Sequence, residues 1–269
     1  MVPDCAGRTA VPVSASCPRI LSIAGSDSGG GAGIQADIKT ITMLGGHAMT
    51  AITAITAQNT MGVQSVHLVP TQMILAQIES VASDIGVDAV KIGMIGSAEA
   101  ARTVADYLDG LSVPIVFDPV MVATSGSELA DGETIAAFDR LMDVASVVTP
   151  NLPELAALGG RDEILGHGCH LVIKGGHGEG PVIVDELYSP GGLIRRLEGK
   201  RLETSETHGT GCTFASALAV GLGSGMDLTA AFEQATSFTR IAILEAPGLG
   251  AGSGPLGHQF VTDFQDEDR

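Results

Sequence analysis

Short apolar runs alternate with amphipathic segments along most of the chain. Nearly continuous aliphatic runs are typical of strands buried on both faces of a parallel sheet. They occur at residues 19–25, 88–94, 113–118, 145–149 and 169–174. Two further segments, residues 47–57 and 63–69, are rich in β-branched residues or alternate in polarity, and we expect strands there as well.

Helical spacing of apolar residues separates these runs and is clearest over residues 71–85. The other predicted helices cover residues 34–44, 98–108, 132–142, 152–158, 211–222 and 227–245, the last capped by Asp227. A hairpin is predicted at residues 181–188 and 193–197. Alternating strands and helices favour right-handed crossovers. The pattern therefore predicts an α/β fold with a doubly wound, mostly parallel central sheet and a small β-hairpin extension.

Composition indicates one domain with an aliphatic core. The 269 residues are 45% hydrophobic but only 3% aromatic, without Trp. No linker-like stretch interrupts the middle of the chain, so we interpret residues 19–260 as a single domain. Residues 1–18 mix Pro, Ser and Ala without an apolar signal segment and are predicted to form a disordered leader, and residues 261–269 an acidic tail.

The net charge of −17 narrows the partners that the protein can bind. Lys and Arg total only 14 and form no stripe, which argues against a nucleic-acid partner. The charge also disfavours anionic membranes, and no apolar stretch is long enough to span one. The four cysteines have neither zinc-site nor redox-pair spacing, so we expect a reduced, cytoplasmic protein. A site for an anion must therefore obtain its positive potential from backbone amides and a few cations or metal ions.

The segment Thr207-His208-Gly209-Thr210-Gly211-Cys212 is the strongest candidate for such a site. It leads into an apolar helix, whose first N–H groups lack intrahelical partners and attract anions. Cys212 falls in the first turn, where the helix dipole is expected to lower the pKa of the thiol. Amides around an ionisable group suit phosphoryl transfer. The alternative is an ordinary helix start capped by Thr210.

Polar or flexible residues also follow each predicted buried strand. The carboxyl ends of parallel strands meet at one edge of a sheet, where ligands bind in open α/β folds. We therefore expect the following residues to lie near one another: Gly25, Gln58, Met94, Asp118, Asn151 and Lys174.

Four charged or polar residues near this edge suggest phosphate and metal chemistry. Asp118 directly follows a buried strand, where a carboxylate is costly unless it is paired or binds a metal. Asn151 and Glu154 lie one helical turn apart and can offer oxygen ligands to Mg²⁺, or form a capping box, or both. Lys174 precedes two glycines that permit a phosphate to approach, although it could instead be a surface lysine.

A dinucleotide fingerprint competes with this interpretation. Gly31-Ala32-Gly33-Ile34-Gln35-Ala36 fits G-x-G-x-x-G/A after a strand. However, the region about 20 residues onward lacks the acidic residue that would bind a ribose. A Walker A loop is absent, because Gly199-Lys200 is followed by Arg201.

Eight motifs in order resemble the hydroxymethylpyrimidine/phosphomethylpyrimidine kinase family of thiamine biosynthesis, which has a ribokinase-like fold. They span about residues 19–258: AGSD (24–27), GGAGIQAD (30–37), TAQNT (56–60), KIGM (91–94), DPVM (118–121), TPNLPE (149–154), KGGH (174–177) and THGTGC (207–212). The resemblance implies a three-layer sandwich and the transfer of the γ-phosphoryl group of ATP to 4-amino-5-hydroxymethyl-2-methylpyrimidine and then to its monophosphate.

The resemblance also implies roles for individual residues. Gln58 would bind the pyrimidine, with the surrounding positions Gly25, Asp37, Met94 and Val120. The amides of Gly209, Gly211 and Cys212 would form an anion hole, and Cys212 stands where ribokinase relatives place an aspartate base. Lys174, Asn151 and Thr210 would bind phosphates, and Mg²⁺ would be held by Asp118 and Glu154.

Two departures from the family pattern and three alternatives stay open. Gly29 stands where the family usually has Ser, and the segment between Glu154 and Lys174 is shorter than usual, by about one helix. The protein could instead be a pyridoxal kinase of the same fold, an NAD(P)-dependent oxidoreductase using the loop at residues 31–36, or a non-catalytic ligand sensor. A homodimer is also possible.

Overall fold

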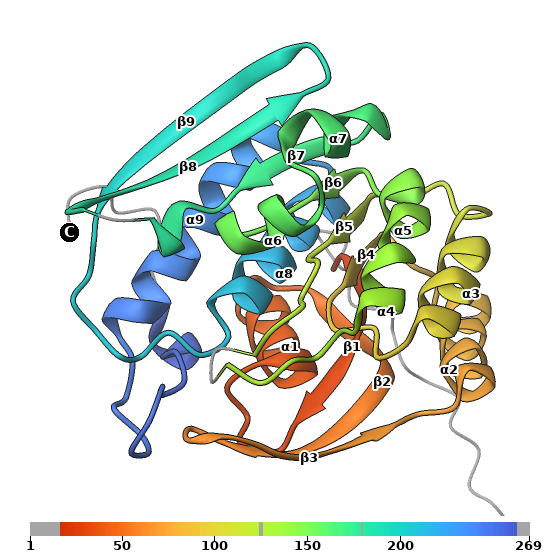
Figure 1. Ribbon diagram of the computed structural model, residues 1–269, viewed down its shortest axis with the longest axis horizontal. Helices are drawn as coiled ribbons and strands as arrows, with labels where there is room; N and C mark the ends of the chain where they lie inside the picture. Colours follow the sequence, from red (N-terminus) through yellow and green to blue (C-terminus); the bar gives the residue numbers. More distant parts are fainter. Residues whose placement is uncertain (1–16, 124–125, 179, 263–269) are drawn as a thin grey trace, which may run out of the picture.

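The computed structural model describes residues 17–123, 126–178 and 180–262. In these residues a nine-stranded sheet is covered by helices on both faces (Figure 1). The strand order is β3-β2-β1-β4-β5-β6-β7-β8-β9. In this order, six neighbouring strands run parallel: β2, β1, β4, β5, β6 and β7. The remaining strands, β3, β8 and β9, pair antiparallel with their neighbours.

The bounds of the elements are as follows. The strands are β1 (Arg19–Asp27), β2 (His47–Asn59), β3 (Gly62–Leu68), β4 (Ala89–Ile92), β5 (Ile115–Phe117), β6 (Val147–Val148), β7 (His170–Ile173), β8 (Val182–Ser189) and β9 (Gly192–Lys200). The helices are α1 (Gly33–Met43), α2 (Thr71–Asp84), α3 (Ala98–Leu108), α4 (Gly132–Ala136), α5 (Phe138–Val144), α6 (Leu152–Ala157), α7 (Arg161–Gly166), α8 (Thr210–Gly223) and α9 (Leu228–Leu244), with 3₁₀ turns η1 (Gly175–His177) and η2 (His258–Phe260).

The structure confirms the predicted doubly wound, mostly parallel sheet, and the predicted hairpin is β8–β9 at its edge. One helix prediction was wrong in detail, and one helix was not predicted. The segment 132–142 forms two helices, α4 and α5, which meet at Ala137. Helix α7 was not predicted; it follows Gly159 and Gly160, whose positive φ angles end α6. With α6 and α7 in the connection, β6 and β7 pair in parallel despite the short segment between them.

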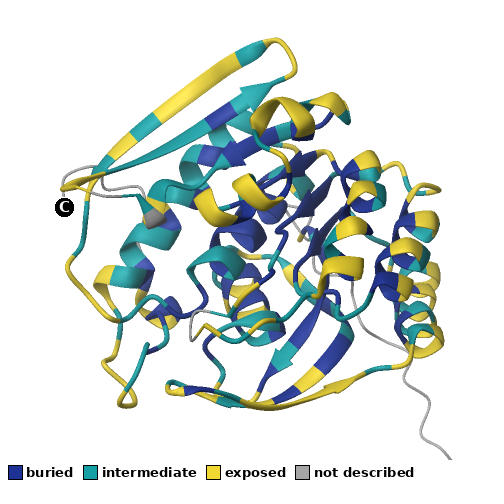
Figure 2. Ribbon diagram, in the orientation of Figure 1, coloured by how far each residue is buried: buried dark blue, intermediate teal, exposed yellow. Residues whose placement is uncertain are grey.

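Two apolar layers hold the sheet between the helices. On one face, strand residues pack against α2, α3 and α5, and on the other against α1, α8 and α9. Figure 2 shows the buried residues concentrated in the central strands and in α8. Helix α8 is buried from Thr213 to Gly221, because its small residues let it lie directly on the sheet. The first turn of this helix is thereby held at the carboxyl end of the strands.

The ends of the chain fall largely outside the described residues. The predicted leader is described only from Cys17, and the predicted acidic tail only at Val261 and Thr262. Pro18 is buried, and its carbonyl accepts a hydrogen bond from the His47 amide. Among the residues that the structure describes, no helix is both long and apolar enough to cross a membrane.

Candidate active site

An aspartate and a lysine from different strands form the centre of the candidate site. Asp118 follows β5 and Lys174 follows β7, and their Oδ1 and Nζ atoms are 2.6 Å apart. The Thr149 hydroxyl donates a second hydrogen bond to Asp118 Oδ1, at 3.2 Å. The lysine side chain keeps 16% of its surface exposed, and the aspartate side chain 2%. Burial disfavours the charge of Lys174, but Asp118 and Glu154 hold its pKa above the usual value. The site therefore contains a permanent cation at the end of the sheet.

The first turn of α8 lies against this ion pair. A Cβ atom on Gly211 would be 3.2 Å from both Asp118 Oδ2 and Lys174 Nζ. Gly209 is the N-cap residue, with a φ of 89°. A side chain at Gly209 would also overlap the carbonyl of Gly31. Thr210 is the first helical residue and makes no side-chain cap, so the alternative of a Thr210-capped helix start was wrong.

Of the two roles that the sequence left open for Asn151 and Glu154, the structure shows the capping box. They form a capping box at the start of α6: Asn151 Oδ1 accepts from the Glu154 amide at 2.9 Å, and Glu154 Oε2 accepts from the Asn151 amide at 2.8 Å. Asn151 also pairs with Lys174 through an isolated parallel bridge. The capping box therefore places Glu154 beside the central ion pair.

The charges of this cluster fit a divalent cation. Burial raises the pKa of Glu154 to about 7, Lys174 lowers it, and Asp118 raises it further. When Glu154 is ionised, the two carboxylates and the single ammonium of Lys174 carry a net negative charge. Carboxylate oxygens beside a phosphate site are ligands that Mg²⁺ accepts, together with water and substrate oxygens. The described residues contain no group of three or more His, Cys, Asp or Glu side chains placed to hold a metal, so substrate would have to complete such a site.

The pKa of Cys212 differs from the sequence-based expectation. Burial, Asp37 and Asp118 raise it to about 11, although Lys91 acts in the opposite direction. The predicted lowering by the helix dipole was therefore wrong, because desolvation and two nearby carboxylates outweigh the field of the helix. Cys212 is a neutral thiol at pH 7.

A second group of predicted residues gathers at the ends of β1, β2 and β4. A Cβ atom on Gly25 would lie 3.0 Å from the sulfur of Met94, so these two residues are in contact. The Thr53 hydroxyl donates to the Met94 carbonyl at 2.6 Å and fixes the chain there. Val120 is half-buried after β5, where its amide donates to the Asp118 carbonyl. Val120 thus lies two residues after Asp118 of the central ion pair.

Asp37 is placed differently from the other predicted ring-binding residues. Its carboxylate is fully buried and 2.9 Å from Lys91 Nζ, at both oxygens. The hydroxyls of Ser22 and Ser216 donate to the same carboxylate, at 2.6 and 2.8 Å. These contacts occupy the group from three sides and join α1 to β1, β4 and α8. We therefore propose that Asp37 holds the surrounding elements together and does not contact the substrate.

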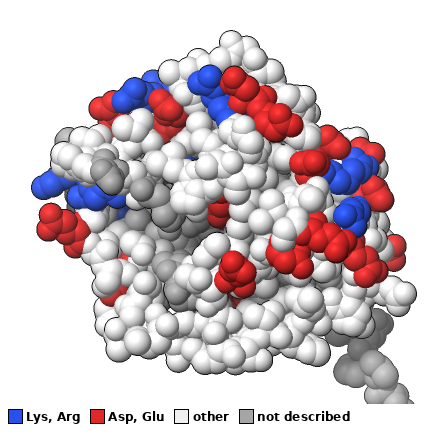
Figure 3. Space-filling model, in the orientation of Figure 1, with Lys and Arg blue, Asp and Glu red and all other residues white. Residues whose placement is uncertain are grey.

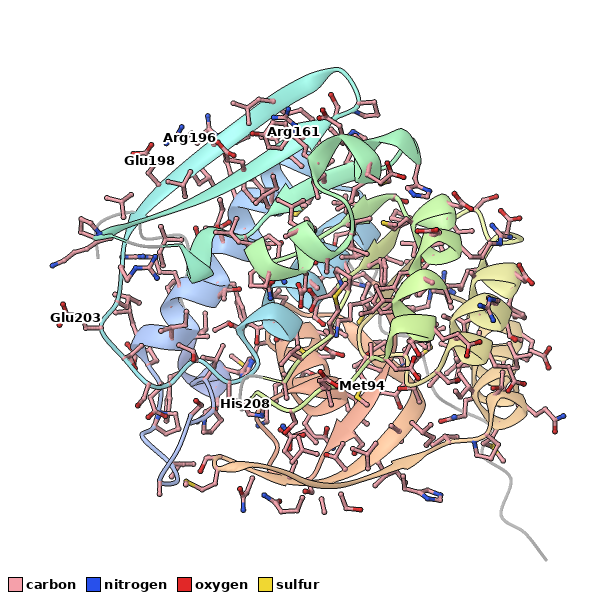
Figure 4. All side chains as sticks on the ribbon, in the orientation of Figure 1. Met94, Arg161, Arg196, Glu198, Glu203 and His208 are labelled. Carbon is pink, nitrogen blue, oxygen red and sulfur yellow. The ribbon has the colours of Figure 1, made fainter. Side chains whose placement is uncertain are left out.

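His208 is a residue of the site that our sequence analysis did not single out. Its Nε2 atom is 2.9 Å from Asp27 Oδ2 and 3.2 Å from Gln58 Nε2. Figure 4 labels His208 and Met94, which both lie in the lower central part of the view, above β3. The signal available in the sequence was the position of His208 within the motif THGTGC.

The glycine loop before α1 is organised around Asp27. The carboxylate of Asp27 accepts hydrogen bonds from the amides of Gly29, Gly31 and Ala32, at 2.8 to 2.9 Å. A dinucleotide site needs such amides for a pyrophosphate, and here they are directed at a protein carboxylate. This arrangement argues against the oxidoreductase alternative. A Cβ atom on Gly29 would lie 3.1 Å from Asp27 Oδ1 and 3.2 Å from the Gln58 carbonyl oxygen. These short distances show that the loop packs closely at Gly29.

The surface around the site offers few cations. In Figure 3 most Lys and Arg side chains lie near the rim of the face shown, and acidic residues gather over α3 to α5. Positive potential for an anion therefore comes from within, from Lys174 and the first amides of α8. This agrees with the expectation drawn from the net charge.

Comparisons with known proteins show the family of the chain. The sequence pattern of the family described as phosphomethylpyrimidine kinase matches residues 27–257. The hydroxymethylpyrimidine/phosphomethylpyrimidine kinase of Streptomyces coelicolor is 44% identical over 258 residues, which cover 91% of this chain and 95% of that protein. The thiamine biosynthesis multifunctional protein of Corynebacterium efficiens is 42% identical over 262 residues; the match covers 91% of this chain but only 36% of that longer protein.

A solved structure gives the class of fold. The pyridoxal kinase of Bacillus subtilis, in a complex with ADP, superposes with a TM-score of 0.83 and 34% identity, covering 91% of this chain and 98% of that chain. The three-layer sandwich is thus the ribokinase-like fold of small-molecule kinases. Within that class, the chain belongs to the phosphomethylpyrimidine kinase family.

Proposed function

We propose that the protein uses ATP to phosphorylate 4-amino-5-hydroxymethyl-2-methylpyrimidine, and then the resulting monophosphate, in thiamine biosynthesis. The observation that carries this proposal is the Asp118–Lys174 pair lying against the first turn of α8 beside Gly211. A fixed cation and helix amides at one point suit a phosphoryl group in transfer. The family to which the chain belongs supplies the substrate class.

In the first proposed reaction the substrate hydroxyl oxygen forms a bond to the γ-phosphorus, the bond to the leaving ADP oxygen breaks, and the hydroxyl proton passes to the transferring phosphoryl oxygens or to water. In the second, a phosphate oxygen of the monophosphate attacks the γ-phosphorus and ADP leaves in the same way. The amides of Gly209, Gly211 and Cys212 and the ammonium of Lys174 would hold the transferring group. Such preorganised donors stabilise charge that develops in the transition state. The thiol of Cys212 is neutral and therefore poorly suited to act as the base. We propose that Cys212 contributes mainly through its backbone amide, which would bind the transferring phosphoryl group.

The neighbouring residues would hold the nucleotide and the metal ion. Asn151 and Thr210 would contact the phosphates of ATP. Asp118 and Glu154 would hold Mg²⁺ through their carboxylates, and Mg²⁺ when bound would neutralise charge on the phosphate oxygens. Burial and, to a smaller extent, the Asp118 carboxylate raise the pKa of Glu154 to about 7, and a bound cation would favour its ionised form.

Gln58 would recognise the pyrimidine at the other end of the site. Its amide can donate and accept, as the edge of an aminopyrimidine requires. Gly25, Met94 and Val120 would line the ring, where the absence of a side chain at Gly25 leaves room beside the Met94 sulfur.

The test is release of ADP by purified protein with ATP, Mg²⁺ and either the alcohol or its monophosphate, measured side by side. We expect turnover with both substrates. Absence of turnover with both would overturn the proposal, and turnover of the monophosphate alone would restrict it to the second step. Pyrimidine that raises Tm without any ATP turnover would instead indicate a ligand sensor.

A pyridoxal kinase activity is the second candidate, favoured by the structural likeness to the Bacillus subtilis enzyme. Both substrate classes are small heteroaromatic rings that carry a hydroxymethyl group. The ratio of kcat/KM for the pyrimidine alcohol and for pyridoxal decides between them. We expect this ratio to favour the pyrimidine.

Two further expectations concern the state of the protein. The three cysteines in the described part of the chain are free, which suits the predicted cytoplasmic location. A homodimer remains a prediction, which light scattering on the purified protein checks.

A further inference from the structure

The contacts around Gln58 bear on how its amide is oriented. On one side, Gln58 Nε2 is 3.2 Å from His208 Nε2, and on the other, Gln58 Oε1 is 3.1 Å from the Thr56 hydroxyl oxygen. The nitrogen and oxygen of a glutamine amide exchange places by a half-turn about the last side-chain bond. The surrounding hydrogen-bond network decides between the two orientations.

The His208 side requires an acceptor on Gln58. Asp27 is ionised: burial raises the pKa of its carboxyl, but the hydrogen bonds from His208 and from backbone amides outweigh burial and hold it below the usual range. A carboxylate 2.9 Å from His208 Nε2 needs a proton on that nitrogen. A protonated Nε2 has no lone pair left to accept from the Gln58 NH₂ group. The same N–H can, however, be shared between Asp27 and an oxygen of Gln58.

The Thr56 side requires a donor on Gln58. The single hydroxyl proton of Thr56 is directed to the Ser26 carbonyl, at 3.0 Å. The Thr56 oxygen can then accept from Gln58 but cannot also donate to it. One half-turn of the amide satisfies both sides together: Oε1 accepts from His208, and Nε2 donates to Thr56.

We propose that His208, held by Asp27, is a positioning residue that fixes the orientation of the Gln58 amide and thereby the order of donor and acceptor that the substrate meets. This inference rests on the proposed role of Gln58 in binding the pyrimidine. In the fixed orientation, Gln58 keeps one N–H and one oxygen lone pair for the substrate. An aminopyrimidine offers the complementary pair, an exocyclic N–H beside a ring nitrogen. A pyridine alcohol such as pyridoxine lacks such a pair.

His208 links elements that are far apart in the sequence, which explains how one side chain can set this order. It lies 150 residues from Gln58 and 181 residues from Asp27. The side chain is 8% exposed, and that of Asp27 is 3% exposed. Burial keeps water from competing for these hydrogen bonds, so the orientation exists before substrate binds.

The first experiment compares kcat/KM for the pyrimidine alcohol and for pyridoxine in three variants. His208→Ala should lower the value for the pyrimidine by roughly tenfold and the value for pyridoxine much less. His208→Gln, whose amide can donate to both Asp27 and Gln58, should regain most of the loss. The control His258→Gln alters another buried histidine, bonded to Thr213 in α8, and should leave the ratio unchanged.

An equal loss for both substrates after His208→Ala, without rescue by Gln, would overturn the proposal and leave His208 with a merely structural role. A Gln58→Ala background adds a second criterion. The effect of His208→Ala should largely disappear there, because the amide that it orients is gone. Persistence of the full effect would count against the proposal.

The second experiment does not depend on activity. Nuclear Overhauser effects from the Gln58 side-chain NH₂ in the ligand-free protein should reach Thr56 and not the His208 ring. The opposite pattern would overturn the proposed orientation. A wild-type protein that shows the expected pattern but turns over neither pyrimidine substrate would instead refute the proposed function while leaving the orientation established.

Discussion

Two lysine–aspartate pairs stand side by side in this fold and differ in how far they are closed off. Lys91 and Asp37 are completely buried, and both carboxylate oxygens are occupied by the ammonium and by serine hydroxyls. Lys174 and Asp118 have the same chemistry, but the lysine keeps part of its surface exposed beside the first turn of α8.

The comparison shows that a buried charge acquires a role from what remains unsatisfied around it. The partners of Asp37 fill its hydrogen-bonding capacity, so the pair can join four elements but has little left to offer a ligand. The Lys174 ammonium interacts through its charge with Asp118 and Glu154. Among the described residues it donates a hydrogen bond only to Asp118, so its other N–H groups are available to a ligand. The first pair is suited to holding the site together and the second to working in it.

The largest effect is expected for Lys91→Met. Removal of the ammonium leaves Asp37 buried without a counter-charge, which costs about 3–5 kcal/mol of unfolding free energy. Urea denaturation measures this loss, and Lys91→Met combined with Asp37→Asn should recover part of it. Arg102→Gln, which breaks the exposed ion pair with Glu133, is the control and should change stability little. A Lys91 variant as stable as wild type would break the comparison.

Lys174→Met should instead act on catalysis. Loss of one preorganised cation is expected to lower kcat by about 10²–10³-fold, with a smaller change in Tm than in the Lys91 variant. ADP release under saturating substrate measures kcat, and Lys200→Met on the exposed end of β9 is the matched control. If Lys174→Met mainly unfolds the protein and the folded fraction keeps its kcat, the two pairs do not differ in the way described.

Cys212→Ala is expected to have a smaller effect on kcat than Lys174→Met. A general base typically contributes about 10²–10⁴-fold, but a thiol with a pKa of about 11 is protonated at pH 7. We therefore expect a loss below about 10²-fold, with KM for the pyrimidine nearly unchanged. A loss as large as that of Lys174→Met would show that the thiol itself takes the proton.

His258 extends the comparison to a buried base that has no carboxylate partner among the described residues. It is bonded to the Thr213 hydroxyl, and burial lowers its pKa to about 4. The unfolded chain, with a pKa near 6.5, takes up a proton that the folded protein refuses, so stability is complete above pH 6.5 and is lost as the pH falls toward 4. By pH 5.5 this term amounts to about 1.4 kcal/mol. Urea titrations at pH 7.5 and 5.5 should show a smaller decrease for His258→Gln than for wild type; equal decreases would contradict the prediction.

Much of the fold was predictable because its signals are local. The strand and helix alternation led to the parallel sheet, and α3 was predicted at the bounds that it has, Ala98–Leu108. The capping box at Asn151 and the cap at Asp227 followed from residues within one turn of each other. Helix α7 escaped prediction because six residues carry too little periodicity to show a helix.

In the candidate site, too, local features could be predicted from the sequence and long-range contacts could not. Its location at the strand ends followed from topology, since parallel strands must present their carboxyl ends together. The pKa of Cys212 did not follow, because it depends on how deeply the thiol is buried and on carboxylates from α1 and β5. The family resemblance implied that Asp37 lies near the ring, and the contact of its carboxylate with Lys91 likewise depends on segments that are distant in the sequence.

The class of fold, the edge of the sheet where the site forms and the residue types available there can thus be predicted from the amino-acid sequence. Which lysine is closed off, which remains available and how His208 meets Gln58 across 150 residues depend on the packed structure. Periodicity and capping can be predicted because they act over a few residues. Burial and hydrogen-bond partners, in contrast, depend on distances that exist only after distant segments have packed together.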